Sequence, residues 1–316
     1  MNTRQAIWRT LAGIAALIVI AGAGLALTFA PTTLHIPAVD VGPLPPASPP
    51  TSMSISALPT GTYETPAMLA FRGGSWSDVR HFAATAVLVQ HPNGNLLIDT
   101  GFGKHVGEHM KMLPSIQRST HSTAVAAVDQ LASGGIQPGS LAGVIPTHAH
   151  WDHISGLDDL GNVPVMVSAA AKRWIDTKAK GTEVINSLRS INYRQYDFTG
   201  GPYLGFPRSH DVWGDGSVVI VPAPAHTPDS VVVFISLPSG TRYALVGDLV
   251  WQMEGIELPA DKPWMLRRLI GENSAEVHKD IAILRSAIAT YPQIHAIPAH
   301  DAASFRLIPS FPAIAQ

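Results

Sequence analysis

The residues of this chain that are best suited to chemistry lie in one short run, 147–153, which reads Thr-His-Ala-His-Trp-Asp-His. Its ligand-type side chains are His148, His150, Asp152 and His153. Imidazole and carboxylate groups are the natural ligands of zinc and similar divalent cations. A lone histidine between apolar residues usually belongs to the core, but core packing does not explain four such side chains at this spacing. The run therefore predicts a metal site.

The residues on either side of this run indicate where it lies. The segment 141–146 is apolar and rich in β-branched residues, as is typical of a buried strand. The segment 154–160 opens with turn residues that can lead into a short helix. Proteins of the α/β class place their chemistry beyond the carboxyl ends of strands. We therefore expect the four side chains on a loop between a strand and a helix.

Three further candidate ligands each follow an apolar, strand-like run of their own. They are His226 after residues 218–224, Asp248 after residues 243–247, and His300 after residues 294–299. An aspartate after a strand is often only a turn or helix cap, and this alternative stays open for Asp248 taken alone. The repeated placement at strand ends favours one shared metal site. Only five of the fourteen histidines occupy such positions.

The order H-x-H-x-D-H, then a distant His, an Asp and a His, resembles that of the metallo-β-lactamase-fold hydrolases, from about Phe82 to Asp301. The resemblance implies an α/β fold of the αβ/βα sandwich type and two divalent metal ions, with zinc expected. Carried over to this chain, it implies one cation bound by His148, His150 and His226 and a second bound by Asp152, His153 and His300. Asp248 would bridge the two cations. Asp99, in the run 96–101, would support the ligand histidines.

The resemblance also implies a reaction class. Two cations sharing a bridging hydroxide would hydrolyse a lactone or carboxylic ester, with Asp152 relaying the proton to the leaving group. The spacing looks most like that of acyl-homoserine lactonases, which typically place a Tyr three residues after the bridging Asp. This chain has Trp251 there, and an indole donates only one hydrogen bond.

Several alternatives stay open at this point. Phosphoester, organophosphate or thioester hydrolysis could use the same dinuclear site, because many reactions share this scaffold. An iron-dependent redox enzyme on the scaffold, or a binding protein without catalysis, belongs to a different class. Metal content together with turnover would separate these possibilities.

The segment 176–216 is the candidate for substrate contact. It is rich in aromatic residues, among them Tyr193 and Tyr196, and it also carries several basic residues. One interpretation is a surface cover over the flank of the domain. The other is an aromatic wall, extended by Trp251, that binds an apolar acyl or aromatic group of a small-molecule substrate.

Composition excludes other classes. The formal net charge is −2 and no basic stripe is present, so nucleic acid is not expected as a partner. The chain contains no cysteine, which excludes disulfides, thiolate catalysis and cysteine metal ligands. The 316 residues suffice for one large α/β domain with an N-terminal appendage.

The N-terminus predicts a location. Arg4 and Arg9 precede an apolar run from Leu11 to Ala30, which matches the ~20 residues that cross a bilayer. This run is long for a cleaved secretory signal, so we favour a membrane anchor over that alternative. No Lys or Arg follows Ala30 until Arg72, so the catalytic domain is expected on the extracytoplasmic side, the periplasm in a Gram-negative bacterium.

The chain accordingly divides into three parts. Residues 1–30 form the anchor or signal, 31–60 a Pro-rich linker that works as a semi-rigid spacer, and 61–316 the hydrolase domain. Within the domain we expect a hairpin over residues 81–99, strands over 163–167, 217–224, 231–237 and 242–246, and helices over 122–131 and 169–175. A last helix should begin at Asn273, with an apolar stripe at Val277, Ile281, Leu284 and Ile288.

Overall fold

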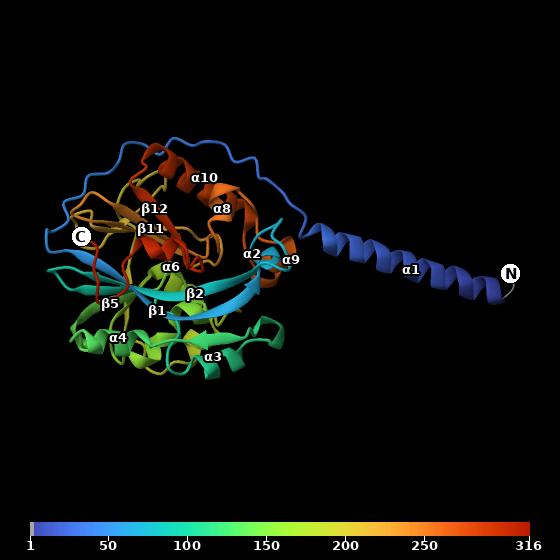
Figure 1. Cartoon of the computed structure of the whole chain (residues 1–316), viewed down its shortest axis with the longest axis horizontal. Coiled ribbons are helices and arrows are strands. Elements are labelled where there is room, and N and C mark those ends of the chain that lie inside the picture. The colour runs from blue at the N-terminus through green and yellow to red at the C-terminus, as the bar shows by residue number, and fades with distance from the viewer. Residues whose placement is uncertain (1–2) are drawn as a thin grey trace.

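Two β-sheets packed face to face, with helices on both outer sides, form the domain in the computed structural model, which describes residues 3–316 (Figure 1). In spatial order the first sheet contains β4 (His121–Thr123), β1 (Ser54–Pro66), β2 (Val79–Gln90), β3 (Asn95–Ile98), β5 (Leu141–Ile145), β6 (Val165–Ser168) and β7 (Tyr193–Tyr196). The second contains β12 (Ile294–Pro298), β11 (Arg242–Gly247), β10 (Val231–Ser236), β9 (Val218–Pro222) and β8 (His210–Asp211). Strands β3, β5, β6 and β7 are parallel, as are β11 and β12, and the other pairs are antiparallel.

Helices connect and cover these sheets. They are α1 (Thr3–Leu27), α2 (Ala67–Ala70), α3 (Val106–Met112), α4 (Ala127–Ser133), α5 (Trp151–Ile154), α6 (Ala169–Asp176), α7 (Glu183–Ser187), α8 (Glu254–Glu257), α9 (Trp264–Ile270) and α10 (Ser274–Thr290). Short 3-10 turns occupy Ser115–Gln117, Pro138–Ser140, Ser155–Asp159 and Ser304–Leu307.

Strand β9 illustrates why these sequences form doubly covered sheets. Val219 and Val221 lie in the core under α10, whereas Val218 and Ile220 lie in the core between the two sheets. Successive side chains of a strand point to opposite faces, so a strand that is buried on both faces must be apolar at every position. The continuous apolar runs that precede the candidate ligands have this origin.

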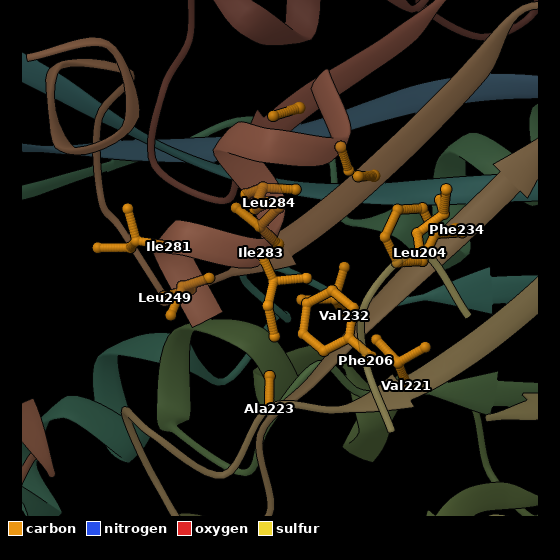
Figure 2. Close-up of a cluster of buried hydrophobic side chains, with 14 of the residues drawn as sticks. Leu204, Phe206, Val221, Ala223, Val232, Phe234, Leu249, Ile281, Ile283 and Leu284 are labelled. Atoms are coloured by element: carbon orange, nitrogen blue, oxygen red, sulfur yellow. The ribbon is translucent and has the colours of Figure 1, made fainter. Parts of the chain in front are cut away.

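Three cores separate the layers. The core between the sheets includes Ile98 and Leu245, and the core on the outer face of the first sheet joins Val144 to helices such as α6. Figure 2 shows the third, in which Phe234 and neighbouring strand residues pack against Ile281 and Leu284 of α10. The order is helix, sheet, sheet, helix, so the predicted αβ/βα sandwich is confirmed.

Helix α10 begins as predicted. The Asn273 side chain accepts hydrogen bonds from the backbone amides of Ala275 (3.2 Å) and Glu276 (3.5 Å), which satisfies amides that have no partner within the helix. Val277, Ile281 and Leu284 are buried along one side, which aligns the helix on the second sheet. The predicted hairpin is also present, as β2 and β3 joined by the turn at residues 91–94.

Two expectations about the chain are wrong. The helix expected over 122–131 begins only at Ala127, because residues 121–123 pair with β1 as strand β4. Strand β1 itself begins at Ser54, inside the segment assigned to the linker. Its Pro, Ser and Thr content conceals a strand that bends at a bulge between Pro59 and Gly61. A side chain at Gly61 would come within 2.5 Å of the Phe102 ring and of the Ser122 carbonyl.

The rest of the Pro-rich segment is not a spacer that stands away from the domain. It runs along the outside of α10 and the second sheet (Figure 1). The Leu34 amide donates to the Pro259 carbonyl at 3.1 Å, the Val39 amide donates to Ser286 Oγ at 3.0 Å, and Arg242 Nη2 donates to the Pro45 carbonyl at 2.7 Å. Repeated contacts of this kind tie the segment to the domain.

Helix α1 extends from the domain (Figure 1). It has 25 residues, is long and apolar enough to cross a membrane, and buries none of its most apolar stretch against the rest of the chain.

Candidate metal centre

The structure brings all seven predicted ligand side chains together at one edge of the sandwich. His148 and His150 follow β5, while Asp152 and His153 lie in α5. The other three follow strands of the second sheet: His226 after β9, Asp248 after β11 and His300 after β12. The loops at the ends of both sheets meet here, so residues far apart in sequence become neighbours.

These side chains form two groups. His148, His150, His226 and Asp248 make up one, and Asp152, His153 and His300 make up the other; within each group the potential ligand atoms lie within 4.8 Å of one another. His150 is half-buried and the other six residues are buried. The grouping agrees with the division implied by the family resemblance.

Asp248 lies between the two groups. Its Oδ2 atom is 3.4 Å from Nε2 of His226 and 3.8 Å from Nε2 of His148. Its Oδ1 atom is 3.2 Å from Nε2 of His153 and 3.0 Å from Nε2 of His300. One carboxylate oxygen therefore faces each group, as a bridging ligand requires.

Unsatisfied polar atoms test whether these residues fit a cation. Nε2 of His148, Nε2 of His153 and Oδ1 of Asp248 are buried and make no well-aligned hydrogen bond within the described chain, although Oδ1 lies close to two imidazoles. Such atoms are costly in a folded protein unless something else satisfies them. Burial and the neighbouring imidazoles lower the pKa of His148 and of His150 well below the usual value, so both rings stay neutral and keep a free lone pair. The donor set fits divalent cations that prefer nitrogen and oxygen ligands.

Asp99 lies directly behind the centre. Its carboxylate accepts hydrogen bonds from the Thr147 amide at 2.6 Å and the Thr147 hydroxyl at 2.9 Å, and it lies 2.9 Å from Nδ1 of His153. Burial alone would lower the pKa of His153, but the carboxylates of Asp99 and Asp248 outweigh it and raise that pKa well above the usual value. The contact with Nδ1 turns Nε2 of the same ring toward Asp248.

A second supporting carboxylate was missed by the sequence interpretation. Glu272 Oε2 lies 3.2 Å from Nδ1 of His226 and accepts a 2.7 Å hydrogen bond from Lys262 Nζ. The same ammonium donates to the Asp248 carbonyl at 2.8 Å. Burial opposes ionisation of Glu272, but Lys262 and His226 prevail and lower its pKa. No local signal could identify this pair, since Lys262 and Glu272 lie in loops outside every ligand motif.

Tyr63 of β1 was also missed. Its hydroxyl donates to Asp152 Oδ2 at 3.2 Å and lies 3.4 Å from Nε2 of His300. Its ring lies against Phe82 and Trp151, with centroids 5.2 Å and 6.0 Å away. Burial and the carboxylates of Asp152 and Asp248 raise the pKa of Tyr63 well above the usual value, so the phenol remains a hydrogen-bond donor.

The three tentative substrate residues have different outcomes. Trp251 lies at the centre, where its Nε1 donates to Asp248 Oδ2 at 2.9 Å. Tyr193 and Tyr196 lie elsewhere, because β7 is the outermost strand of its sheet. The Lys172 ammonium lies over the Tyr193 ring, and the Tyr196 ring stacks on His210. Within the described residues 3–316, neither tyrosine makes a hydrogen bond or ring contact with any of the seven ligand residues.

The aromatic wall expected from residues 176–216 is therefore not formed by these tyrosines. Gly181, at a φ of +93°, is a residue of that segment that lies close to the centre. A Cβ atom there would lie 2.7 Å from Nε2 of His150, so only glycine allows this close approach.

Comparison with known proteins identifies the family. Residues 79–297 match the metallo-beta-lactamase superfamily. The chain belongs to this superfamily. Within it, "Probable metallo-hydrolase Rv2300c" of Mycobacterium tuberculosis is 25% identical over 246 residues, which cover 70% of this chain and 75% of that protein. "N-acyl homoserine lactonase AttM" of Rhizobium radiobacter is 22% identical over 174 residues, covering 53% of this chain and 65% of the relative.

A solved structure of an N-acyl homoserine lactone hydrolase, with the product N-hexanoyl-L-homoserine bound at its catalytic metal centre, has the same fold. The TM-score is 0.65 at 16% sequence identity, and the match covers 83% of this chain and 98% of that one. This metallo-β-lactamase superfamily chain thus combines the family fold with two His/Asp groups able to bind metal.

Proposed function

We propose that this protein is a dinuclear metal-dependent hydrolase that cleaves a lactone or carboxylic ester, and that its metals are zinc. The observation that carries the proposal is the position of Asp248, with one oxygen toward each His/Asp group. Support for the substrate class comes from the relative named as an N-acyl homoserine lactonase and from the product bound in the similar solved structure.

Different groups of the centre have different roles in the proposed hydrolysis. A pair of divalent cations, when bound, supplies hydroxide near neutral pH and polarises a carbonyl oxygen. Hydrolysis adds water across the acyl carbon–oxygen bond, so the leaving alkoxide must gain a proton. We assign this proton transfer to Asp152, because its Oδ2 atom faces the space between Tyr63 and His300.

Tyr63 is assigned to a positioning and polarising role. The indole of Trp251 already donates its single N–H to Asp248, so it has no donor left for a substrate carbonyl. The Tyr63 O–H is also donated, to Asp152, but a phenol can rotate its hydrogen toward an oxygen that gains negative charge, whereas the indole N–H is fixed in the plane of its ring. A phenol supplied from this strand would compensate for the Trp at the position where the lactonase pattern has Tyr.

The test combines metal analysis with a hydrolysis screen. The purified full chain should contain two zinc ions and turn over lactones or aryl esters in preference to thioesters and phosphotriesters. Asp152→Asn should lose kcat much more than it changes KM, while retaining metal. Iron with oxygen consumption, preferred turnover of a phosphotriester, or an equal loss of kcat and of substrate affinity in Asp152→Asn would contradict the proposal.

We also propose that α1 is an uncleaved membrane anchor and that the domain lies on the extracytoplasmic side. The cationic Arg4 and Arg9 near its start support this orientation. The contacts of residues 27–34 with the domain support retention of the helix, because cleavage would release a segment that is bound to the fold. The intact mass of the membrane-extracted protein distinguishes an anchor from a cleaved signal. Protease digestion of sealed cells tests on which side of the membrane the domain lies.

A further inference from the structure

We propose that the domain rests on the lipid surface with the face that surrounds the end of α1, so that the metal centre opens beside the membrane interface. This face comprises residues 72–79, 257–259 and helix α9, and is called the α1-proximal face below. The inference rests on the proposed role of α1 as a membrane anchor, and extends it to the orientation of the whole domain.

The end of α1 is fixed to the domain without a flexible tether. Arg72 donates from Nε to the Ala30 carbonyl at 3.0 Å and from Nη2 to the Leu27 carbonyl at 3.1 Å. The Gly73 amide donates to the Phe29 carbonyl at 3.0 Å. Because these bonds begin at the last residue of the helix, a membrane around α1 must meet the domain at this point.

Helix α9 lies beside this junction (Figure 1). The amide of Met265 in α9 donates to Thr28 Oγ1 at 3.3 Å, and Thr28 is completely buried. Five of the seven residues of α9 are apolar, yet none is buried. Trp264 and Arg268 are exposed and the other residues of α9 are half-buried, as suits a short segment that lies at a lipid interface.

Large apolar side chains are exposed around the same junction. Trp76 is 69% exposed, Leu258 57% and Trp264 41%. Each belongs to a segment that bonds residues 28–34, through Gly73, Pro259 and Met265 respectively. Tryptophan is favoured at membrane interfaces, where its apolar ring and polar N–H are both satisfied. Arg268, whose guanidinium lies over the Trp264 ring, adds a cation that suits lipid phosphates.

Packed side chains and a hydrogen bond connect the metal centre to this face. Tyr63 and Trp251 contact Asp152 and Asp248, respectively, and pack against a small apolar cluster that includes two residues of α2 and Phe71, next to Arg72 of this face. These two side chains are half-buried, as is His150, so they are the parts of the centre that remain partly accessible. A second connection joins the loop beside His150 to α9, since Lys180 Nζ donates to the Leu269 carbonyl at 2.6 Å.

A substrate with an apolar chain could therefore keep that chain in the lipid while its ester group reaches the centre. A protein partner is the other conceivable occupant of an exposed apolar face. The membrane is favoured because a 25-residue apolar helix leaves the domain from within this face.

The absence of cysteine from the chain allows a direct test. Single cysteines are introduced into the full chain and spin-labelled. Each labelled protein is then reconstituted in nanodiscs of phosphatidylethanolamine and phosphatidylglycerol. Trp76→Cys and Trp264→Cys report on the α1-proximal face, and Leu17→Cys reports on α1. Ile314→Cys is the matched control: it is 46% exposed and lies near the C-terminus, on the far side of the domain from α1 (Figure 1).

The readout is the ratio of collisions with lipid-soluble oxygen to collisions with an aqueous nickel chelate. We expect this ratio to be several-fold higher at positions 76 and 264 than at 314, and highest at 17. Equal ratios at 76, 264 and 314, with a lipid value at 17, would overturn the orientation while leaving the anchor intact. Aqueous values at all four positions would overturn both. Unchanged thermal unfolding of each labelled chain controls for misfolding.

A second measurement addresses substrate delivery. Trp264→Ser should raise KM for a long-chain ester embedded in vesicles and leave KM for a short, water-soluble ester unchanged. An equal change for both esters would count against delivery from the lipid. Since the collision ratios require no turnover, failure of the proposed hydrolase activity and failure of the proposed orientation are distinguishable.

Discussion

The buried pair Lys262–Glu272 provides the sharpest test of how the centre is supported. Its two side chains are 5% and 0% exposed and their charged atoms are 2.7 Å apart. Glu272 also contacts Nδ1 of His226, while the other ring nitrogen, Nε2, is the proposed metal ligand. Glu272→Gln keeps the size of the side chain and removes its charge, which leaves the Lys262 ammonium buried without a counter-ion.

Breaking a buried ion pair from one side costs about 3–5 kcal/mol, mainly because the remaining charge is uncompensated. The two backbone carbonyls that also accept from Lys262 reduce this cost, so we expect about 3 kcal/mol for Glu272→Gln. For a domain of this size such a loss lowers Tm by roughly 6–12 °C. Removing the partner of His226 should also weaken metal binding by about 10–100-fold.

The assay is chemical denaturation of the chelator-treated protein, combined with a competition measurement of zinc affinity. Lys262→Met and the double variant Lys262→Met/Glu272→Gln complete a cycle. The double variant contains no unpaired charge, so it should recover part of the stability and show a coupling energy of about 2–3 kcal/mol. The exposed pair Lys279–Glu276 is the control, where Glu276→Gln should change stability by less than ~1 kcal/mol.

Two results would refute the reasoning. A Glu272→Gln variant within about 1 kcal/mol of the parent would mean that the ammonium is solvated or neutral at this position. Normal zinc affinity despite the expected destabilisation would mean that Glu272 stabilises the fold without orienting His226.

Other perturbations have equally definite outcomes. Burial raises the pKa of Asp280 to about 7, so the folded state binds this proton more tightly than the unfolded state; stability should fall by about 4 kcal/mol as pH rises from 4 through 7. Asp280→Asn should remove that fall, and denaturation curves that run parallel to the parent from pH 5 to 8 would contradict it. Tyr63→Phe should reduce kcat about 10–100-fold with metal content unchanged, because it removes one hydrogen bond to a charged group; steady-state kinetics and elemental analysis check this. Phe234→Ala, at a residue only 1% exposed, should lower the free energy of unfolding by about 3–5 kcal/mol without altering KM, and a loss below ~1 kcal/mol would show that the core repacks.

The sequence by itself determined the candidate ligands and most of the strands around them. A strand buried on both faces must be apolar throughout, so the polar residue at its end stands out, as His226 does after β9 and Asp248 after β11. The sequence also predicted the N-cap of α10, because the Asn273 side chain accepts hydrogen bonds from amides only two and three residues away. These features depend on side-chain type and on neighbours in sequence.

Only the tertiary structure decided which distant residues support the centre. Tyr63 reaches Asp152 across 89 positions, and Glu272 reaches His226 across 46, so neither contact leaves a local pattern. Strand β1 looked like linker because its pairing with β2 stabilises a sequence with low intrinsic strand preference. The placement of α1 against Arg72 is of the same kind: hydropathy predicts an apolar helix, but contacts between separate segments decide which face of the domain it adjoins.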